Sequence, residues 1–178
     1  ALIPLLTGVQ RSSRTQTEMA SMRAAIRGGM QIVSSDLQEL EADSTSGESD
    51  ITALTSTDIW YRAHRGLGVV CDASQTELRI RSDSTWAGLH APTTGTDGLY
   101  LFSEGVVDES SDDAWLTVPI AGAVSSGTCS AGGTAWIVPV ALSAPQVANV
   151  VTEAPVRTYE RMHLGPVMDG GRNWLGIE

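Results

Sequence analysis

Large apolar residues recur every three or four positions along the first part of the chain. They are Met19, Met22, Ile26, Met30, Val33, Leu37 and Leu40. This spacing follows the period of an α-helix, about 3.6 residues, and no strand has that period. The pattern therefore predicts an amphipathic helix whose apolar stripe packs on another element of the fold.

The residues before this stripe are polar on every side. Gln10–Glu18 reads QRSSRTQTE and contains no helix stop, so one helix is predicted across Thr7–Ala42. At about 1.5 Å per residue, this helix would be roughly 50 Å long. We divide the N-terminal region into a membrane-proximal stem, residues 1–18, and a half packed on a sheet, residues 19–42.

Arg11 and Arg14 place positive charge toward the N-terminal end of this helix, where the macrodipole disfavours it. A short helix that is polar on every side is marginal in water, so we expect the stem to be frayed in the isolated protein and ordered only beside a partner or lipid headgroups. Arg11 and Arg14 would be its assembly contacts, with membrane contact near residues 1–14. Gly28 and Gly29 each cost about 1 kcal/mol inside a helix, so close approach of a strand or a kink is expected there.

Segments with alternating apolar and polar residues, rich in β-branched and aromatic types, follow. They are Ile51–Leu54, Asp58–Arg65, Gly68–Cys71, Glu77–Ser82, Leu99–Glu104, Trp115–Ile120, Trp136–Val140, Val156–His163 and Asn173–Gly176. Turn-forming residues separate them, notably in Ser125–Thr134, and Ser143–Pro155 is interpreted as a connector. One helix followed only by strands predicts an α+β fold in which residues 43–178 form an antiparallel meander.

Composition excludes several functions. The chain has 178 residues, a net charge of -10 and a sequence pI of about 4.6, which disfavours nucleic acid as a partner. All 11 basic residues are Arg, and enzymes that depend on a Schiff-base or phosphate-loop lysine are therefore excluded. The sequence holds no run of the roughly 18–20 apolar residues that a membrane-spanning helix needs.

Candidate catalytic residues are sparse. His64, His90 and His163 are far apart in sequence, and each is interpreted as a surface or sheet residue. Gly127–Gly132 only approaches a nucleophile-elbow motif and is interpreted as a turn that holds Cys129. We expect neither catalysis nor a cofactor.

An acidic run offers the one candidate metal site. Asp108, Glu109, Asp112 and Asp113 supply the hard oxygen atoms that Ca²⁺ prefers. The run lacks the residue order and central glycine of an EF-hand loop, so a solvated loop is the default interpretation and no metal is predicted.

Tryptophan is unusually frequent relative to phenylalanine, with 5 Trp against 1 Phe. A buried indole needs a partner for its N–H group, so several of these rings are expected at the edge of the core or at an interface. Ordinary core packing is the alternative.

Cys71 and Cys129 are too far apart in sequence for a zinc or redox motif. In an oxidising compartment, a bridge between them would stabilise the fold by roughly 3–5 kcal/mol in the chain-entropy model. Two buried reduced thiols are the alternative.

The order of these parts resembles minor type IV pilins and the pseudopilins of type II secretion. The resemblance rests on the polar stem, on DIWYRA at Asp58–Ala63, on GVVC at Gly68–Cys71 and on the tail Pro155–Gly176. Such proteins carry a prepilin leader and a glutamate within a long apolar anchor helix. Neither is found in this sequence, so the anchor is expected to be truncated here.

The resemblance implies a non-catalytic structural subunit with a pilin-like fold, in which the helix packs on an antiparallel sheet. It implies protein partners in a membrane-associated assembly at the periplasmic or cell-surface side of a bacterial membrane. It also implies a Cys71–Cys129 disulfide, because that side is oxidising. The alternative is an accessory subunit that bridges parts of a larger integral-membrane complex without forming a fibre.

Overall fold

The fold was analysed in a computed structural model, which describes residues 2–38, 40, 49–105, 109 and 111–177. The chain divides into two compact units, Ala1–Glu39 and Leu40–Glu178. The predicted boundary between Ala42 and Asp43 lies outside the described residues.

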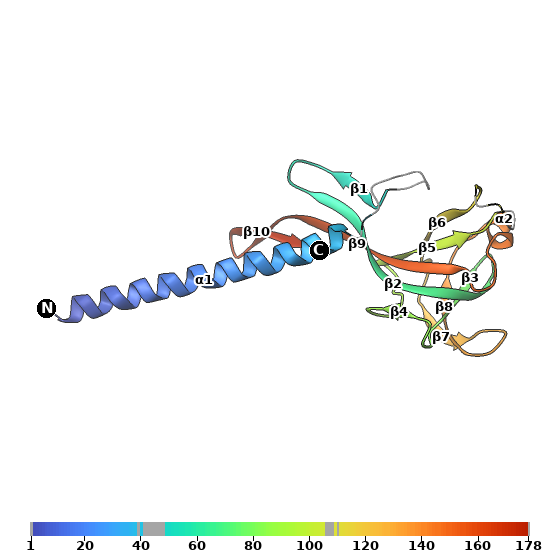
Figure 1. The fold of residues 1–178 in the computed structure, drawn as a ribbon, viewed down its shortest axis with the longest axis horizontal. Coiled ribbons are helices and arrows are strands. Elements are labelled where there is room, and N and C mark those ends of the chain that lie inside the picture. The colour runs from blue at the N-terminus through green and yellow to red at the C-terminus, as the bar shows by residue number, and fades with distance from the viewer. Residues whose placement is uncertain (1, 39, 41–48, 106–108, 110, 178) are drawn as a thin grey trace. The chain divides into compact units, whose positions relative to one another are not determined.

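The first unit is one helix, α1, which spans Leu2–Gln38 (Figure 1). Its 37 residues confirm that the stem continues into the striped half without a break. Pro4 lies in the first turn, where its missing N–H group would have no intrahelical partner anyway. The first turn holds no acidic residue and the last turn no basic one, so the macrodipole is left uncompensated.

The second unit is built on an antiparallel sheet, which confirms the α+β class (Figure 1). Its strands are β1 (Ile51–Leu54), β2 (Ile59–Ala73), β3 (Glu77–Arg81), β4 (Ala87–Gly88), β5 (Asp97–Ser103), β6 (Ala114–Pro119), β7 (Ser125–Thr128), β8 (Thr134–Pro139), β9 (Pro155–Asp169) and β10 (Arg172–Ile177). The short helix α2 spans Ala144–Ala148. The pilin-like arrangement of helix on sheet stays a prediction.

The strand order is β6-β5-β9-β2-β3-β8-β7, with β1 and β4 also paired to β2, and β10 to β9. The predicted meander is wrong, because β9 inserts between β5 and β2 instead of pairing with β8, the strand before it in sequence. Strands β2 and β9 have 15 residues each and pair from Ile59 opposite Leu164 to Val69 opposite Pro155. They form a long central ribbon.

The core lies where β5, β6 and β9 face β3 and β8, and it is aliphatic. Its buried residues are Val70, Leu78, Ile80, Leu99, Leu101, Val118, Ile120, Val138, Val140, Leu142 and Val156. Each fully buried side chain of this kind contributes roughly 1.5–3 kcal/mol. Strand β9 supplies Val156 to this core, and its next residue, Arg157, is exposed on the opposite face.

Three local predictions need correction. The two strands predicted on either side of Gly66 are one strand, β2, because Gly66 and Gly68 leave room for the ring of Trp86. A Cβ at Gly66 would stand 2.4 Å from that ring. Part of the predicted turn Ser125–Thr134 is strand β7. The predicted connector after Leu142 contains the helix α2. A capping box formed by Ser143 and Gln146 stabilises the first turn of this helix.

Candidate assembly surfaces

The apolar stripe of α1 is largely exposed. The side chains of Met19, Met22, Ile26 and Met30 are 55–65% exposed, and their spacing places them along one side of the helix. Val33 and Leu37 are half-buried. Leu40, predicted as part of the same helix, lies beyond its last described residue, Gln38. A row of exposed methionine and isoleucine is the side of a helix that needs a partner. The predicted packing of this stripe on the sheet stays a prediction.

The stem satisfies many of its own polar groups. Arg14 Nε lies 3.3 Å from Glu18 Oε1, and both side chains are exposed, so this pair stabilises the helix only slightly. The hydroxyl groups of Thr15 and Thr17 donate to backbone carbonyls one turn earlier. The side chain of Arg11 is exposed. The assembly role predicted for Arg11 and Arg14 stays a prediction.

Among the residues that the structure describes, no helix is long and apolar enough to cross a membrane.

One face of the ribbon exposes aliphatic side chains at the end where β1 and β10 flank it. Leu54, Met168 and Leu175 are 67–75% exposed there. Strand β10 pairs with β9 from Arg172 opposite Asp169 to Ile177 opposite Leu164. This end of the sheet therefore offers apolar surface without a partner among the described residues.

The other face of β9 carries arginine and aromatic rings. Residues directly opposite each other in an antiparallel ladder have their side chains on the same face. In the β2–β9 ladder, Trp60 is opposite His163 and Arg62 is opposite Arg161. In the β5–β9 ladder, Tyr100 is opposite Arg157. The guanidinium of Arg157 lies 4.7 Å from the ring centroid of Trp115.

A buried polar cluster lies on this same face. Asp50 is only 3% exposed, and it accepts a hydrogen bond from the Tyr100 hydroxyl group. His64 Nε2 lies 3.3 Å from Asp50 Oδ2, and Arg62 donates to the Tyr100 hydroxyl oxygen at 3.3 Å. Burial and the bond to Asp50 raise the pKa of Tyr100 well above its usual value. The phenol therefore stays protonated and acts as a donor.

This cluster fastens the start of β1 to the sheet. The backbone N–H group of Arg62 also donates to the Asp50 carbonyl oxygen at 2.9 Å. His64 Nδ1 is buried and has no hydrogen-bond partner among the described residues. An imidazole held against Asp50 in this way resembles part of a catalytic triad, but no serine or cysteine nucleophile contacts it among the described residues.

The three histidines lie apart, each beside a different aspartate. Besides the His64–Asp50 contact, His90 Nδ1 lies 3.7 Å from Asp97 Oδ2, and His163 Nε2 lies 2.9 Å from Asp58 Oδ1. The His163 ring also stacks on Trp60 with centroids 4.6 Å apart. A single site that combines the histidines is thus absent from the described part of the chain.

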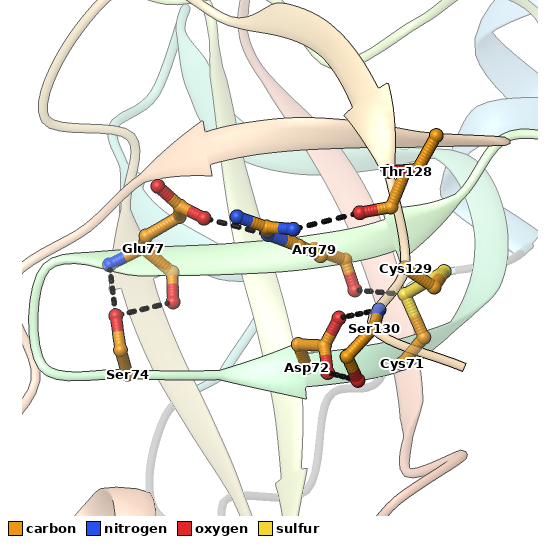
Figure 2. A network of polar contacts seen from close by, with 8 residues as sticks. All are labelled: Cys71, Asp72, Ser74, Glu77, Arg79, Thr128, Cys129 and Ser130. Atoms are coloured by element: carbon orange, nitrogen blue, oxygen red, sulfur yellow. Dashed lines mark hydrogen bonds and ion pairs between the residues drawn. A yellow bond between two sulfur atoms is a disulfide. The ribbon is translucent and has the colours of Figure 1, made fainter. Parts of the chain in front are cut away.

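The two cysteines form a disulfide, which confirms that prediction. The Cα atoms of Cys71 in β2 and Cys129 after β7 are 5.8 Å apart. Figure 2 shows the polar contacts around the bridge. The Ser130 N–H group donates to Asp72 Oδ2 at 2.7 Å, and the Ser130 hydroxyl group donates to the other carboxylate oxygen. These bonds hold the pKa of Asp72 below its usual value of 3.8.

A shallow depression of about 300 Å³ adjoins this network. Its charged side chains are already engaged: Arg79 Nε donates to Glu77 Oε1 at 2.7 Å, and Arg79 Nη1 donates to the Thr128 carbonyl oxygen at 2.7 Å (Figure 2). With Asp72 bonded to Ser130, the depression is best explained as part of the cross-link between two hairpins.

The acidic run is only partly described. Asp108 lies outside the described residues, while Glu109, Asp112 and Asp113 are exposed. Glu109 accepts a hydrogen bond from the Ser111 hydroxyl group at 3.1 Å. The described residues bring together one set of possible metal ligands, Cys71, Asp72 and Cys129, and the disulfide uses both of its sulfur atoms.

Comparison with protein-family models, with curated proteins and with solved structures finds no match for the chain.

Proposed function

We propose that this protein is a non-catalytic, pilin-like structural subunit that works in a membrane-associated assembly outside the cytoplasm. The observation that carries the proposal is the 37-residue helix α1 with its row of large apolar side chains 55–65% exposed. A helix with such a stripe gains most of its stability from packing, so the working state of the protein must cover it.

The second unit supports this proposal in two ways. Its disulfide is typical of proteins that fold in an oxidising compartment such as the periplasm or the cell surface. Its polar clusters, around Asp50 and around Asp72, are explained by anchoring of loops and strands. A structural role accounts for them without a substrate.

In the pilin-like arrangement that we propose, the stripe packs on the sheet of the same subunit, while residues 1–18 contact neighbouring subunits or lipid headgroups. Arg11 and Arg14 would then each contribute roughly 1 kcal/mol near an anionic surface, and added salt would weaken that contact. An accessory subunit that bridges a larger integral-membrane complex would use the same two surfaces and would form no fibre.

Two substitutions test the proposal. Ile26→Asp places a charge in the stripe, and Arg14→Asp is its control on the stem. If the stripe packs on its own sheet, Ile26→Asp lowers the free energy of unfolding of the monomer by several kcal/mol. If it is covered only between subunits, the monomer melts normally and sedimentation velocity shows loss of association. Equal melting shifts for the two variants contradict the proposal, and so does an Ile26→Asp variant that both melts and associates like the wild-type protein.

Two observations separate the pilin-like subunit from the bridging alternative. Electron microscopy of the native assembly shows whether fibres form. The coding sequence upstream of Ala1 can also be read for a leader that ends in Gly before an apolar stretch of about 20 residues with an early glutamate. Both features favour the pilin-like subunit, and their joint absence favours the bridging one.

A further inference from the structure

Two arginines on β9 stand out in a strongly acidic unit. Residues 40–178 contain 7 Arg against 18 Asp and Glu, a formal charge of -11. Arg65, Arg79 and Arg81 each pair with a carboxylate. Within the described residues, the exposed guanidinium groups of Arg157 and Arg161 have no such pair.

These two arginines share a face with two exposed tryptophans. Residues 157, 161, 163 and 167 of β9 all point to one side because side chains alternate along a strand. Trp60 lies opposite His163, and Trp174 lies opposite Val167, so both indoles lie on that same side. Trp60 is 36% exposed and Trp174 is 48% exposed. We name Arg157, Arg161, Trp60 and Trp174 the arginine–tryptophan face.

The order of the two arginines and the two indoles along β9 indicates which kind of ligand would fit this face. At about 3.3 Å per residue, the arginines are roughly 13 Å apart, and the two indole positions follow over the next 20 Å or so. The Arg157 guanidinium is held against the Trp115 ring. An arginine held in this way keeps its N–H groups oriented for a carboxylate and loses little side-chain freedom on binding.

We propose that the arginine–tryptophan face binds an extended acidic segment of a protein partner, in which carboxylates contact Arg157 and Arg161 and apolar side chains contact Trp60 and Trp174. Charge complementarity favours this ligand, because neither Arg157 nor Arg161 pairs with a carboxylate among the described residues. The net charge of -10 repels a long polyanion such as nucleic acid. A short segment with an acidic end and an apolar end matches both halves of the face.

This site is separate from the stripe of α1 and does not rest on the helix-mediated assembly proposed above. Binding by the 178-residue protein can be measured by fluorescence anisotropy with a labelled peptide of six glutamates followed by four leucines. Arg161→Glu is expected to weaken binding several-fold, and Arg157→Glu together with Arg161→Glu about tenfold or more. Raising NaCl from 50 to 500 mM weakens binding by the wild-type protein.

Matched variants and probes define each half of the face. Arg161→Lys keeps the charge and restores most of the affinity, and Arg23→Glu with Arg27→Glu, at two exposed arginines of α1, leaves affinity unchanged. Trp174→Ala weakens binding of the full peptide but not of six glutamates alone. Because the Arg161 side chain has no partner among the described residues, Arg161→Glu is decisive even if Arg157→Glu disturbs Trp115.

Three results overturn the proposal. The first is equal affinity of the wild-type protein and the Arg161→Glu variant for the peptide. The second is equally tight binding of a peptide with six lysines followed by four leucines. The third is tighter, Arg161-dependent binding of polygalacturonate, which would assign the face to an acidic glycan. None of these results bears on the role of Ile26 in assembly, so the two proposals fail separately.

Discussion

The phenol ring of Tyr159 occupies the space directly above the backbone of Gly98. The two residues are opposite each other in the β5–β9 ladder, and a Cβ at Gly98 would stand 2.3 Å from the Tyr159 hydroxyl oxygen. Tyr159 is almost fully buried and also contacts the ring of Tyr100, with centroids 4.7 Å apart. The ring therefore has little room to move.

Gly98→Ala is expected to lower the free energy of unfolding by about 1–3 kcal/mol, because the added methyl group forces this ring out of place. Gly122→Ala is the matched control, since its Cβ would lie 3.4 Å from Pro139, close to an ordinary contact. Its effect should stay within about 0.5 kcal/mol. Urea denaturation measures both values, and equal effects would contradict the packing described for Tyr159.

Removal of the disulfide should destabilise the second unit. The bridge closes a loop between residues separated by 58 positions, for which the chain-entropy model gives about 4 kcal/mol. Replacing both Cys71 and Cys129 with Ser is expected to lower the free energy of unfolding by roughly 2–5 kcal/mol. Native wild-type protein should show no alkylated thiol by intact mass before reduction. Two alkylated thiols in unreduced protein would disprove the bridge.

The carboxyl group of Asp72 should make stability depend on pH in the acid range. Its pKa in the folded protein lies below the usual 3.8, so its contribution is present above the unfolded-state pKa. That contribution is lost as the pH falls through the folded-state pKa. Melting temperatures between pH 7 and pH 2 should therefore fall more steeply for the wild-type protein than for Asp72→Asn.

Asp169→Asn is the control for this experiment, because the Asp169 side chain is exposed and has no hydrogen-bond partner among the side chains that the structure describes. Its melting curve against pH should follow that of the wild-type protein. Parallel curves for the wild-type protein and Asp72→Asn would show that the Ser130 bonds contribute nothing to folding.

Replacing Gly28 and Gly29 with Ala should stabilise α1. No described atom outside the helix lies within 4 Å of a Cβ at either position. Each replacement should favour the helix by about 1 kcal/mol and slow amide exchange nearby. Ser12→Ala with Ser13→Ala is a control with a smaller expected gain. Faster amide exchange in the variant with Gly28→Ala and Gly29→Ala would mean that a close contact needs both glycines, as the sequence suggested.

Local patterns predicted the elements better than their arrangement. Alternation located most strands to within a few residues, because side-chain period is a local property. The break predicted around Gly66 was wrong because Trp86, distant in sequence, fills the space that the missing side chains leave. Insertion of β9 between β5 and β2 had no local signal, since strand order depends on contacts between distant segments.

Some of the candidate surfaces could likewise be predicted from the sequence, and others could not. The stripe of α1 and the disulfide followed from spacing and from the resemblance. The arginine–tryptophan face was missed, although Arg157, Tyr159, Arg161 and His163 alternate with the core-facing residues of β9 and so share a side. The Asp50–Tyr100 bond could not be foreseen, because it joins residues 50 positions apart in a cluster that only the folded sheet assembles.

The central position of β9 has a consequence for the order in which the protein folds. Strand β9 begins at Pro155, yet it pairs with β2, which begins at Ile59, and it also separates β5 from β2. During synthesis, the edges of β2 and β5 stay unpaired until β9 is made, because β9 begins nearly one hundred residues after the start of β2. Such late, non-local closure slows folding and leaves strand edges able to pair with other chains. A partly synthesised chain of this protein would therefore be a substrate for chaperones until β9 is in place.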